Sequence, residues 1–177
     1  MVVFSGGDAS AGSIDTRALA NDAFWQAFAQ SLGFGAMGTQ FDGDYVDAAS
    51  GPGEAVMSAL ATIGQRRNTL SSRMCRCLLQ GFSDGGYVSF TFTQFGPERV
   101  IAFRANKSAT QSLRSTQPSL AVPGLLIWGT DEPGMVNTVR GARSEWSRAR
   151  CDLGRAARVE HGHGPGNIEP LLAPFFC

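Results

Sequence analysis

The chain lacks a surplus of either charge, and it lacks any long apolar run. Fifteen basic and fifteen acidic residues cancel, and only 17% of the 177 residues are charged. Nucleic-acid binders and proteins that adsorb to anionic membranes depend on a cationic surplus, so we expect no nucleic-acid partner. A membrane helix needs roughly 18 consecutive apolar residues, and no stretch approaches that length. We therefore expect no membrane span.

Histidine and cysteine are also scarce. The two histidines, His161 and His163, lie near the carboxyl terminus, and two of the four cysteines, Cys75 and Cys77, are two positions apart. These residues match no recognised zinc spacing, and the cysteines do not form a disulfide framework in a chain of this size. We expect reduced, buried thiols, no metal site and no other cofactor. The amino terminus lacks the features of a signal peptide, so the expected location is cytoplasmic unless a missing amino-terminal segment carries one.

Glycine, in contrast, is abundant. The 22 glycines indicate many tight turns, and short apolar runs alternate with amphipathic stretches in a pattern typical of α/β layering. The length suits one domain over residues 1–177. Residues 87–95 are ambiguous, because their apolar side chains alternate as in a strand. The pattern predicts strands over residues 1–4, 34–40, 74–79, 99–103, 125–128 and 156–160, helices over 14–32, 52–63 and 136–150, and a polar connection over 105–120.

The strongest motif is Gly81-Phe82-Ser83-Asp84-Gly85, which fits the pattern G-x-S-x-G. This pattern requires a sharp turn from a strand into a helix, where a β-carbon on either flanking residue would collide across the bend. An apolar strand leads into the motif, as such a turn demands. The motif alone does not establish a function, because a chain this rich in glycine and serine produces it by chance fairly often.

Two further groups of polar residues follow later strands. Asp131 and Glu132 come after the strand at 125–128, and His163 comes after the last predicted strand. The chain order is therefore serine, acid, histidine, with each member in a loop at the carboxyl end of a strand. Loops at that edge of a parallel sheet lie close together, so the order predicts a catalytic group.

With these motifs in place, the chain resembles the α/β-hydrolase family over nearly its whole length. Residues 122–133 look like the family's strand and acid loop, 159–164 like its histidine turn, 2–7 like its oxyanion strand and turn, and 97–100 like a segment after its nucleophile helix. The resemblance implies a three-layer α/β sandwich with a mostly parallel sheet and no large cap insertion. It also implies that residues 87–95 are helical. The family's first strands are missing, so we expect an amino-terminally truncated form of the fold.

The resemblance implies a role for each polar residue. Ser83 would be the nucleophile, and His163 would act first as general base and then as general acid, with His161 as the less favoured candidate. Either Asp131 or Glu132 would orient the histidine, and the sequence does not separate them. The expected reaction is cleavage of an ester or related acyl bond in a small-molecule substrate through an acyl-enzyme.

The oxyanion hole would use backbone N–H groups of Asp84 and of Gly7 or Asp8. The carboxylate of Asp84, beside a developing oxyanion, departs from the family pattern. This departure and the missing strands suggest the main alternative, a catalytically inactive α/β-hydrolase-like binding or structural protein. A nucleotide-binding loop at residues 5–12 is a weaker alternative, because it matches neither common phosphate-binding pattern.

The missing strands also concern the edge of the sheet. In the family they pair beside the strand that we place at residues 34–40, which would otherwise expose unpaired N–H and C=O groups. This segment has no charge and no proline. We therefore expect self-association through this exposed edge.

Overall fold

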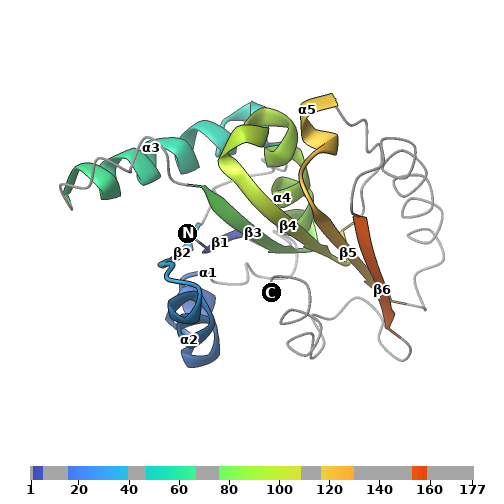
Figure 1. Ribbon diagram of the computed structural model, residues 1–177, viewed down its shortest axis with the longest axis horizontal. Coiled ribbons are helices and arrows are strands. Elements are labelled where there is room, and N and C mark those ends of the chain that lie inside the picture. Colours follow the sequence, from blue (N-terminus) through green and yellow to red (C-terminus); the bar gives the residue numbers. More distant parts are fainter. Residues whose placement is uncertain are drawn as a thin grey trace.

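The computed structural model describes residues 2–5, 16–39, 47–66, 76–108, 117–129 and 153–158. Its six-stranded sheet has the order β2-β1-β3-β4-β5-β6, and every pairing among these strands is parallel (Figure 1). The α/β class with a mostly parallel sheet is therefore confirmed. The strands are β1 (Val2–Ser5), β2 (Ala36–Gly38), β3 (Cys77–Phe82), β4 (Val100–Asn106), β5 (Gly124–Gly129) and β6 (Leu153–Arg158).

Parallel neighbours require crossover connections, and in this fold the connecting helices lie on both faces of the sheet. One cluster of buried side chains joins α3 and α4 to β3, β4 and β5, and a second joins α2 to the opposite face of β3 and β4 (Figure 1). The sheet is thus the middle of three layers. The helical segments are α1 (Thr16–Asn21), α2 (Ala23–Ser31), η2 (Ala48–Ser50), α3 (Pro52–Arg66), α4 (Asp84–Phe95), η4 (Pro97–Arg99) and α5 (Gln117–Leu120).

The helix predicted over residues 14–32 is divided in two. Asp22 separates α1 from α2 with an extended backbone, and its side chain accepts a hydrogen bond of 3.2 Å from the backbone N–H of Trp25. An aspartate in this position satisfies one of the N–H groups that have no partner inside a helix. The apolar spacing continues across the break, which is why periodicity alone predicted a single helix.

Residues 87–95 are helical, as the resemblance implied. Helix α4 is buried on most of its sides, including Ser89 and Thr93, which accounts for the misleading strand-like alternation. The hydroxyls of these two residues donate to the carbonyl oxygens of Gly85, at 2.9 Å, and Phe90, at 2.7 Å. A buried helix can thus contain polar side chains without leaving those hydroxyls unsatisfied.

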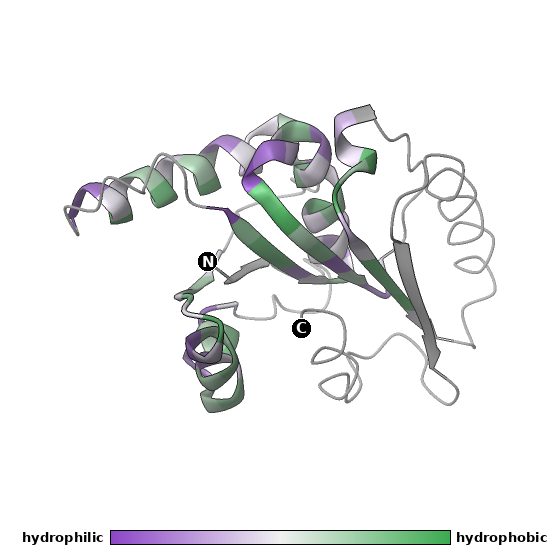
Figure 2. Cartoon of the chain, viewed as in Figure 1, coloured by the Kyte–Doolittle hydropathy of each residue, from purple (hydrophilic) through white to green (hydrophobic). Residues whose placement is uncertain are grey.

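Strand β4 is longer than predicted. The strand predicted over residues 99–103 continues to Asn106. The polar connection predicted over residues 105–120 is therefore wrong at its start, where β4 continues, and near its end, where α5 forms. Figure 2 shows the reason, because β4 changes from hydrophobic in its first half to partly hydrophilic in its second. Strand β3 lies later than predicted and β6 earlier. The helix predicted over residues 136–150 lies outside the described residues.

A bulge marks the beginning of β4. Cys77 pairs with Val100, but Leu78 pairs with Ala102, so Ile101 is an extra residue in the ladder. Its side chain is 37% exposed. Cys77 itself is buried and forms no disulfide, as predicted for it.

Strand β2 is one of the two outer strands of the described sheet, β6 being the other, and it pairs with β1. It is three residues long and its residues are partly exposed. The outer position agrees with the edge predicted for residues 34–40, while self-association stays a prediction. None of the helices in the described ranges has the length and apolar character needed to cross a membrane.

Candidate functional site

Ser83 occupies the turn between β3 and α4. It follows the last residue of β3, precedes the first residue of α4, and is 7% exposed. Its backbone has φ 54° and ψ −124°, one of two positive-φ conformations among the described non-glycine residues. This conformation is costly for a residue with a β-carbon, and such strain concentrates at functional sites.

Glycine at position 81 makes the turn sterically feasible. A β-carbon on Gly81 would overlap the backbone of Gly85 and Gly86 at the start of α4. A β-carbon on Gly86 would lie 2.8 Å from the β-carbon of Ser108. The turn is therefore packed against both its own helix and the end of β4, and the first glycine of the G-x-S-x-G motif has a direct steric explanation.

Backbone hydrogen bonds fix the position of Ser83. Its N–H donates to the carbonyl oxygen of Asn106 at 2.9 Å, and its carbonyl oxygen accepts from the N–H groups of Gly86 at 2.9 Å and Tyr87 at 3.2 Å. The Ser83 side chain makes no capping hydrogen bond to α4. The hydroxyl is therefore not committed to stabilising the helix start, the commonest structural role of a serine in this position.

Asp84 is the first residue of α4 and is partly buried. The backbone N–H groups at the beginning of a helix have no acceptor within the helix and form an anion-attracting end. The carboxylate of Asp84 is also stabilised there by the helix dipole. Its presence beside the turn thus has a structural explanation that is independent of chemistry.

The other predicted site residues lie outside the described residues. These are Gly7, Asp8, Asp131, Glu132, His161 and His163. The strands that precede them in the chain do end at one edge of the sheet: Ser5 of β1 pairs with Gly81, and Gly129 of β5 pairs with Arg158 of β6. Their chain positions are therefore compatible with the predicted grouping at the Ser83 edge, and the grouping itself stays a prediction.

The carboxyl end of β4 contributes polar residues that the sequence prediction missed. Asn106 accepts the hydrogen bond from Ser83, and Lys107 follows it, fully buried, with φ 50°. Arg104, two residues before Asn106, is also fully buried. The sequence did contain a signal for this extension of the strand. Phe103 and Ala105 alternate with the polar residues Arg104 and Asn106, and this alternation has the period of a strand.

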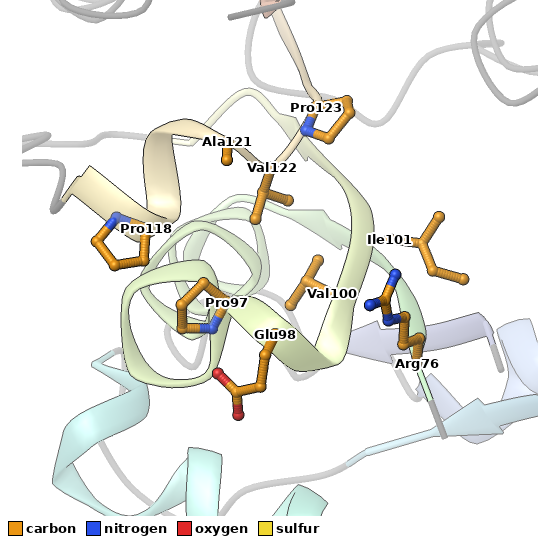
Figure 3. Close-up of a pocket in the computed structure, with 9 residues that line it drawn as sticks. All are labelled: Arg76, Pro97, Glu98, Val100, Ile101, Pro118, Ala121, Val122 and Pro123. Atoms are coloured by element: carbon orange, nitrogen blue, oxygen red, sulfur yellow. The ribbon is translucent and has the colours of Figure 1, made fainter. Parts of the chain in front are cut away.

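A cavity of about 700 Å³ lies at the opposite edge of the sheet (Figure 3). Its lining includes Arg76, just ahead of β3, Val100 and Ile101 at the beginning of β4, and Pro123, just ahead of β5. It is therefore separated from Ser83 by the length of the strands. Within the described ranges, no group of three or more His, Cys, Asp or Glu side chains could hold a metal ion.

By sequence, no protein-family model and no curated protein matches the chain. Several solved structures, however, are similar to the chain in fold. A thermostable esterase is 17% identical with a TM-score of 0.51, and the match covers 68% of this chain and 30% of that one. An uncharacterized protein from Bacillus cereus is 12% identical with a TM-score of 0.73, covering 98% and 56%. Arabidopsis thaliana SOBER1 is 17% identical with a TM-score of 0.52, covering 95% and 91%.

These likenesses concern the fold, because all the identities are low. Together with the parallel sheet between two helical layers, they confirm the predicted α/β-hydrolase-like fold. The chain spans less than two thirds of the length of the thermostable esterase and of the Bacillus cereus protein.

Proposed function

We propose that the protein is a serine hydrolase that cleaves an ester or related acyl bond, with Ser83 as the nucleophile. The strained backbone of Ser83, held between a buried strand and a buried helix, is the observation that carries this proposal. Strain of this kind persists only where surrounding contacts impose it, and it positions a side chain that a relaxed turn would not present. The esterase among the structural neighbours supports the same chemistry.

The proposed reaction has two acyl-transfer steps. The Ser83 hydroxyl oxygen attacks the ester carbonyl carbon while His163 accepts the hydroxyl proton. The tetrahedral intermediate then collapses, the bond to the alcohol oxygen breaks, and His163 returns the proton to the departing alcohol. Water, deprotonated by His163, attacks the acyl-enzyme, and the product acid leaves as Ser83 regains its proton. Asp131 or Glu132 would hold the imidazole in the required orientation.

The oxyanion in each step would accept hydrogen bonds from the backbone N–H of Asp84 and from that of Gly7 or Asp8. The place of Asp84 at the first position of α4 supports this role, because N–H groups there point away from the helix. Strand β1, which ends at Ser5, lies beside β3, so the segment that follows it begins at the same edge.

Active-site labelling tests the proposal directly. A fluorophosphonate probe should label the purified wild-type protein at Ser83, and Ser83→Ala should abolish labelling and lower esterase kcat by about four orders of magnitude or more. Ser108→Ala is a matched control, because Ser108 is also buried and packs against Gly86. Absence of labelling in a folded wild-type protein would favour the alternative, an inactive α/β-hydrolase-like binding or structural protein.

Substitutions of the two histidines assign the base. His163→Ala should remove activity to nearly the extent of Ser83→Ala, while His161→Ala should leave most of it. The reverse result would place the base at position 161. Asp131→Asn and Glu132→Gln separate the two acids, and the correct one should cost less than either Ser83 or the histidine, because it orients rather than reacts.

A further inference from the structure

Arg104 is a cation in the interior of the described fold. Its side chain is fully buried, and none of its three guanidinium nitrogens has a hydrogen-bond partner. A guanidinium carries five N–H donors in a planar fork, and burying them without an acceptor is strongly unfavourable. Burial lowers the pKa of Arg104 to about 9, so the side chain remains charged near neutral pH.

Trp25 compensates for part of this cost. The guanidinium carbon lies 5.8 Å from the centre of the Trp25 ring, in a cation–π contact between β4 and α2. This contact provides no hydrogen-bond acceptor, so the N–H groups of the guanidinium remain without one. A planar guanidinium edge matches the two oxygens of a carboxylate, with two parallel hydrogen bonds.

No carboxylate is buried among the described side chains to fill this position. The buried charged residues in those ranges are Arg104 and Lys107, both cationic. Of the described acidic residues, Asp84 is partly buried and the others are exposed. Among the described residues, no buried carboxylate therefore offsets the charge of Arg104 in the carboxyl half of β4.

This charge lies close to the candidate nucleophile. Arg104 is two residues before Asn106, a distance of about 7 Å along a strand, and Asn106 accepts the backbone hydrogen bond of Ser83. The guanidinium lies on the face of the sheet covered by α2, where it contacts Trp25.

We propose that Arg104 is a specificity-determining residue that binds a carboxylate of the substrate, so that the preferred ester carries a free carboxylate. A monoester of a dicarboxylic acid has this chemistry. The proposal rests on the proposed hydrolase function for its catalytic part, but the binding of the carboxylate does not require hydrolysis. Exclusion of water would strengthen the ion pair between substrate and Arg104.

A binding experiment tests the anion site without catalysis. Glutarate is titrated by calorimetry into the Ser83→Ala protein and into the same protein with Arg104→Met, Arg104→Lys or Arg66→Met added. Arg104→Met should weaken glutarate binding by about 10-fold to 100-fold, the usual effect of losing a charged hydrogen-bonding partner. Arg104→Lys should also weaken it, because lysine lacks the planar fork.

Arg66→Met, at the exposed end of α3, is the control and should not change glutarate binding. Uncharged glutaramide should not bind to any of the proteins. Failure of the Ser83→Ala protein to bind glutarate, or equal binding with and without Arg104, would overturn the proposal. If Arg104→Met does not fold, the folded Arg104→Lys variant decides the same question.

Hydrolysis provides the second readout. The specificity constant kcat/KM is compared between a charged ester, para-nitrophenyl hemiglutarate, and a neutral one, para-nitrophenyl butyrate. Arg104→Met should lower the ratio of charged to neutral ester by about 10-fold to 100-fold, mainly through KM, with little change for the neutral ester. An equal loss for both esters would contradict a role in specificity. Binding of glutarate that depends on Arg104 in a protein without esterase activity would reject the proposed function and retain the anion site.

Discussion

The backbone N–H of Ser83 donates a 2.9 Å hydrogen bond to the carbonyl oxygen of Asn106. This bond extends the pairing of β3 with β4 by one step beyond the last pair, Phe82 with Asn106, and into the turn. The position of Ser83 is therefore determined by two central strands rather than by a surface loop. A side chain built on such a rigid support keeps its orientation, which is what a nucleophile needs.

Gly81→Ala should disrupt the turn. The new methyl group would overlap the backbone of Gly85, and a helix start cannot move aside as a flexible side chain can. We expect a loss of about 3 kcal/mol in the free energy of unfolding, at the upper end of overpacking effects, and a parallel loss of fluorophosphonate labelling. Urea denaturation measures the first and gel fluorescence the second.

Gly96→Ala is the control for this prediction. Gly96 ends the same helix, and the nearest atom to an added β-carbon is 3.7 Å away, which is ordinary contact. This variant should keep both its stability and its labelling. If the two alanine variants behaved alike, the tight turn at Gly81 would not be the cause.

Ser83→Gly should yield a more stable but inactive protein. Glycine adopts φ 54° without the penalty that serine has, and strain of this type costs about 1–3 kcal/mol. Part of the gain is offset by the greater backbone entropy of glycine when unfolded, so we expect a net gain of about 0.5–2 kcal/mol. Ser83→Ala should show no such gain, because alanine retains the β-carbon. Thermal denaturation of the three proteins distinguishes them, and equal stability would mean that the turn is not strained.

The sequence revealed those parts of the fold and site that depend on local chemistry. The motif around Ser83 demanded a strand, a turn and a helix, and these are present because Gly81 leaves room for the helix start to pack against the strand. The break at Asp22 was not foreseen, since a capping aspartate inside a helical pattern also suits an exposed helix surface. The second half of β4 was missed because Arg104 and Asn106 are residues that normally end a buried strand.

Arg104→Met should stabilise the protein at neutral pH. Methionine fills similar space without a buried charge, and we expect a gain of about 1–4 kcal/mol at pH 7. The folded-state pKa of Arg104, lowered by burial to about 9, lies below the ordinary value of 12.5. Above pH 9 the unfolded chain therefore binds more protons than the folded one, and the stability of the wild type rises relative to the variant.

The advantage of Arg104→Met should accordingly be constant up to about pH 8 and shrink as the pH rises through 9 toward 10. Urea unfolding of both proteins at each pH gives the difference directly. A gap that stayed unchanged to pH 10 would mean that the guanidinium keeps its proton in the folded state. A variant less stable than the wild type at pH 7 would mean that the buried charge of Arg104 does not destabilise the folded protein.

The outer strand β2 should mediate self-association. Its partly exposed, uncharged residues offer backbone groups for pairing with another chain. Size-exclusion chromatography of the wild type should show a concentration-dependent shift to larger species. Gly35→Lys adds a charge beside this edge and should reduce the shift, whereas Gln30→Lys adds the same charge at an exposed position of α2 and should not. A monomer at all concentrations would contradict the prediction.

The bulge at Ile101 determines where the chain can tolerate changes in length. Ile101 is itself an extra residue at the beginning of β4, and its side chain lines the cavity of Figure 3. The pairing of β3 with β4 becomes regular again at the next pair, Leu78 with Ala102. After an insertion between Phe103 and Asn106, β4 would end before its regular pairing with β3 could resume. The insertion would also exchange the faces of the sheet on which Arg104 and Ala105 lie. We therefore expect evolutionary insertions and deletions to accumulate ahead of β4, while the spacing from Phe103 to Asn106 stays fixed.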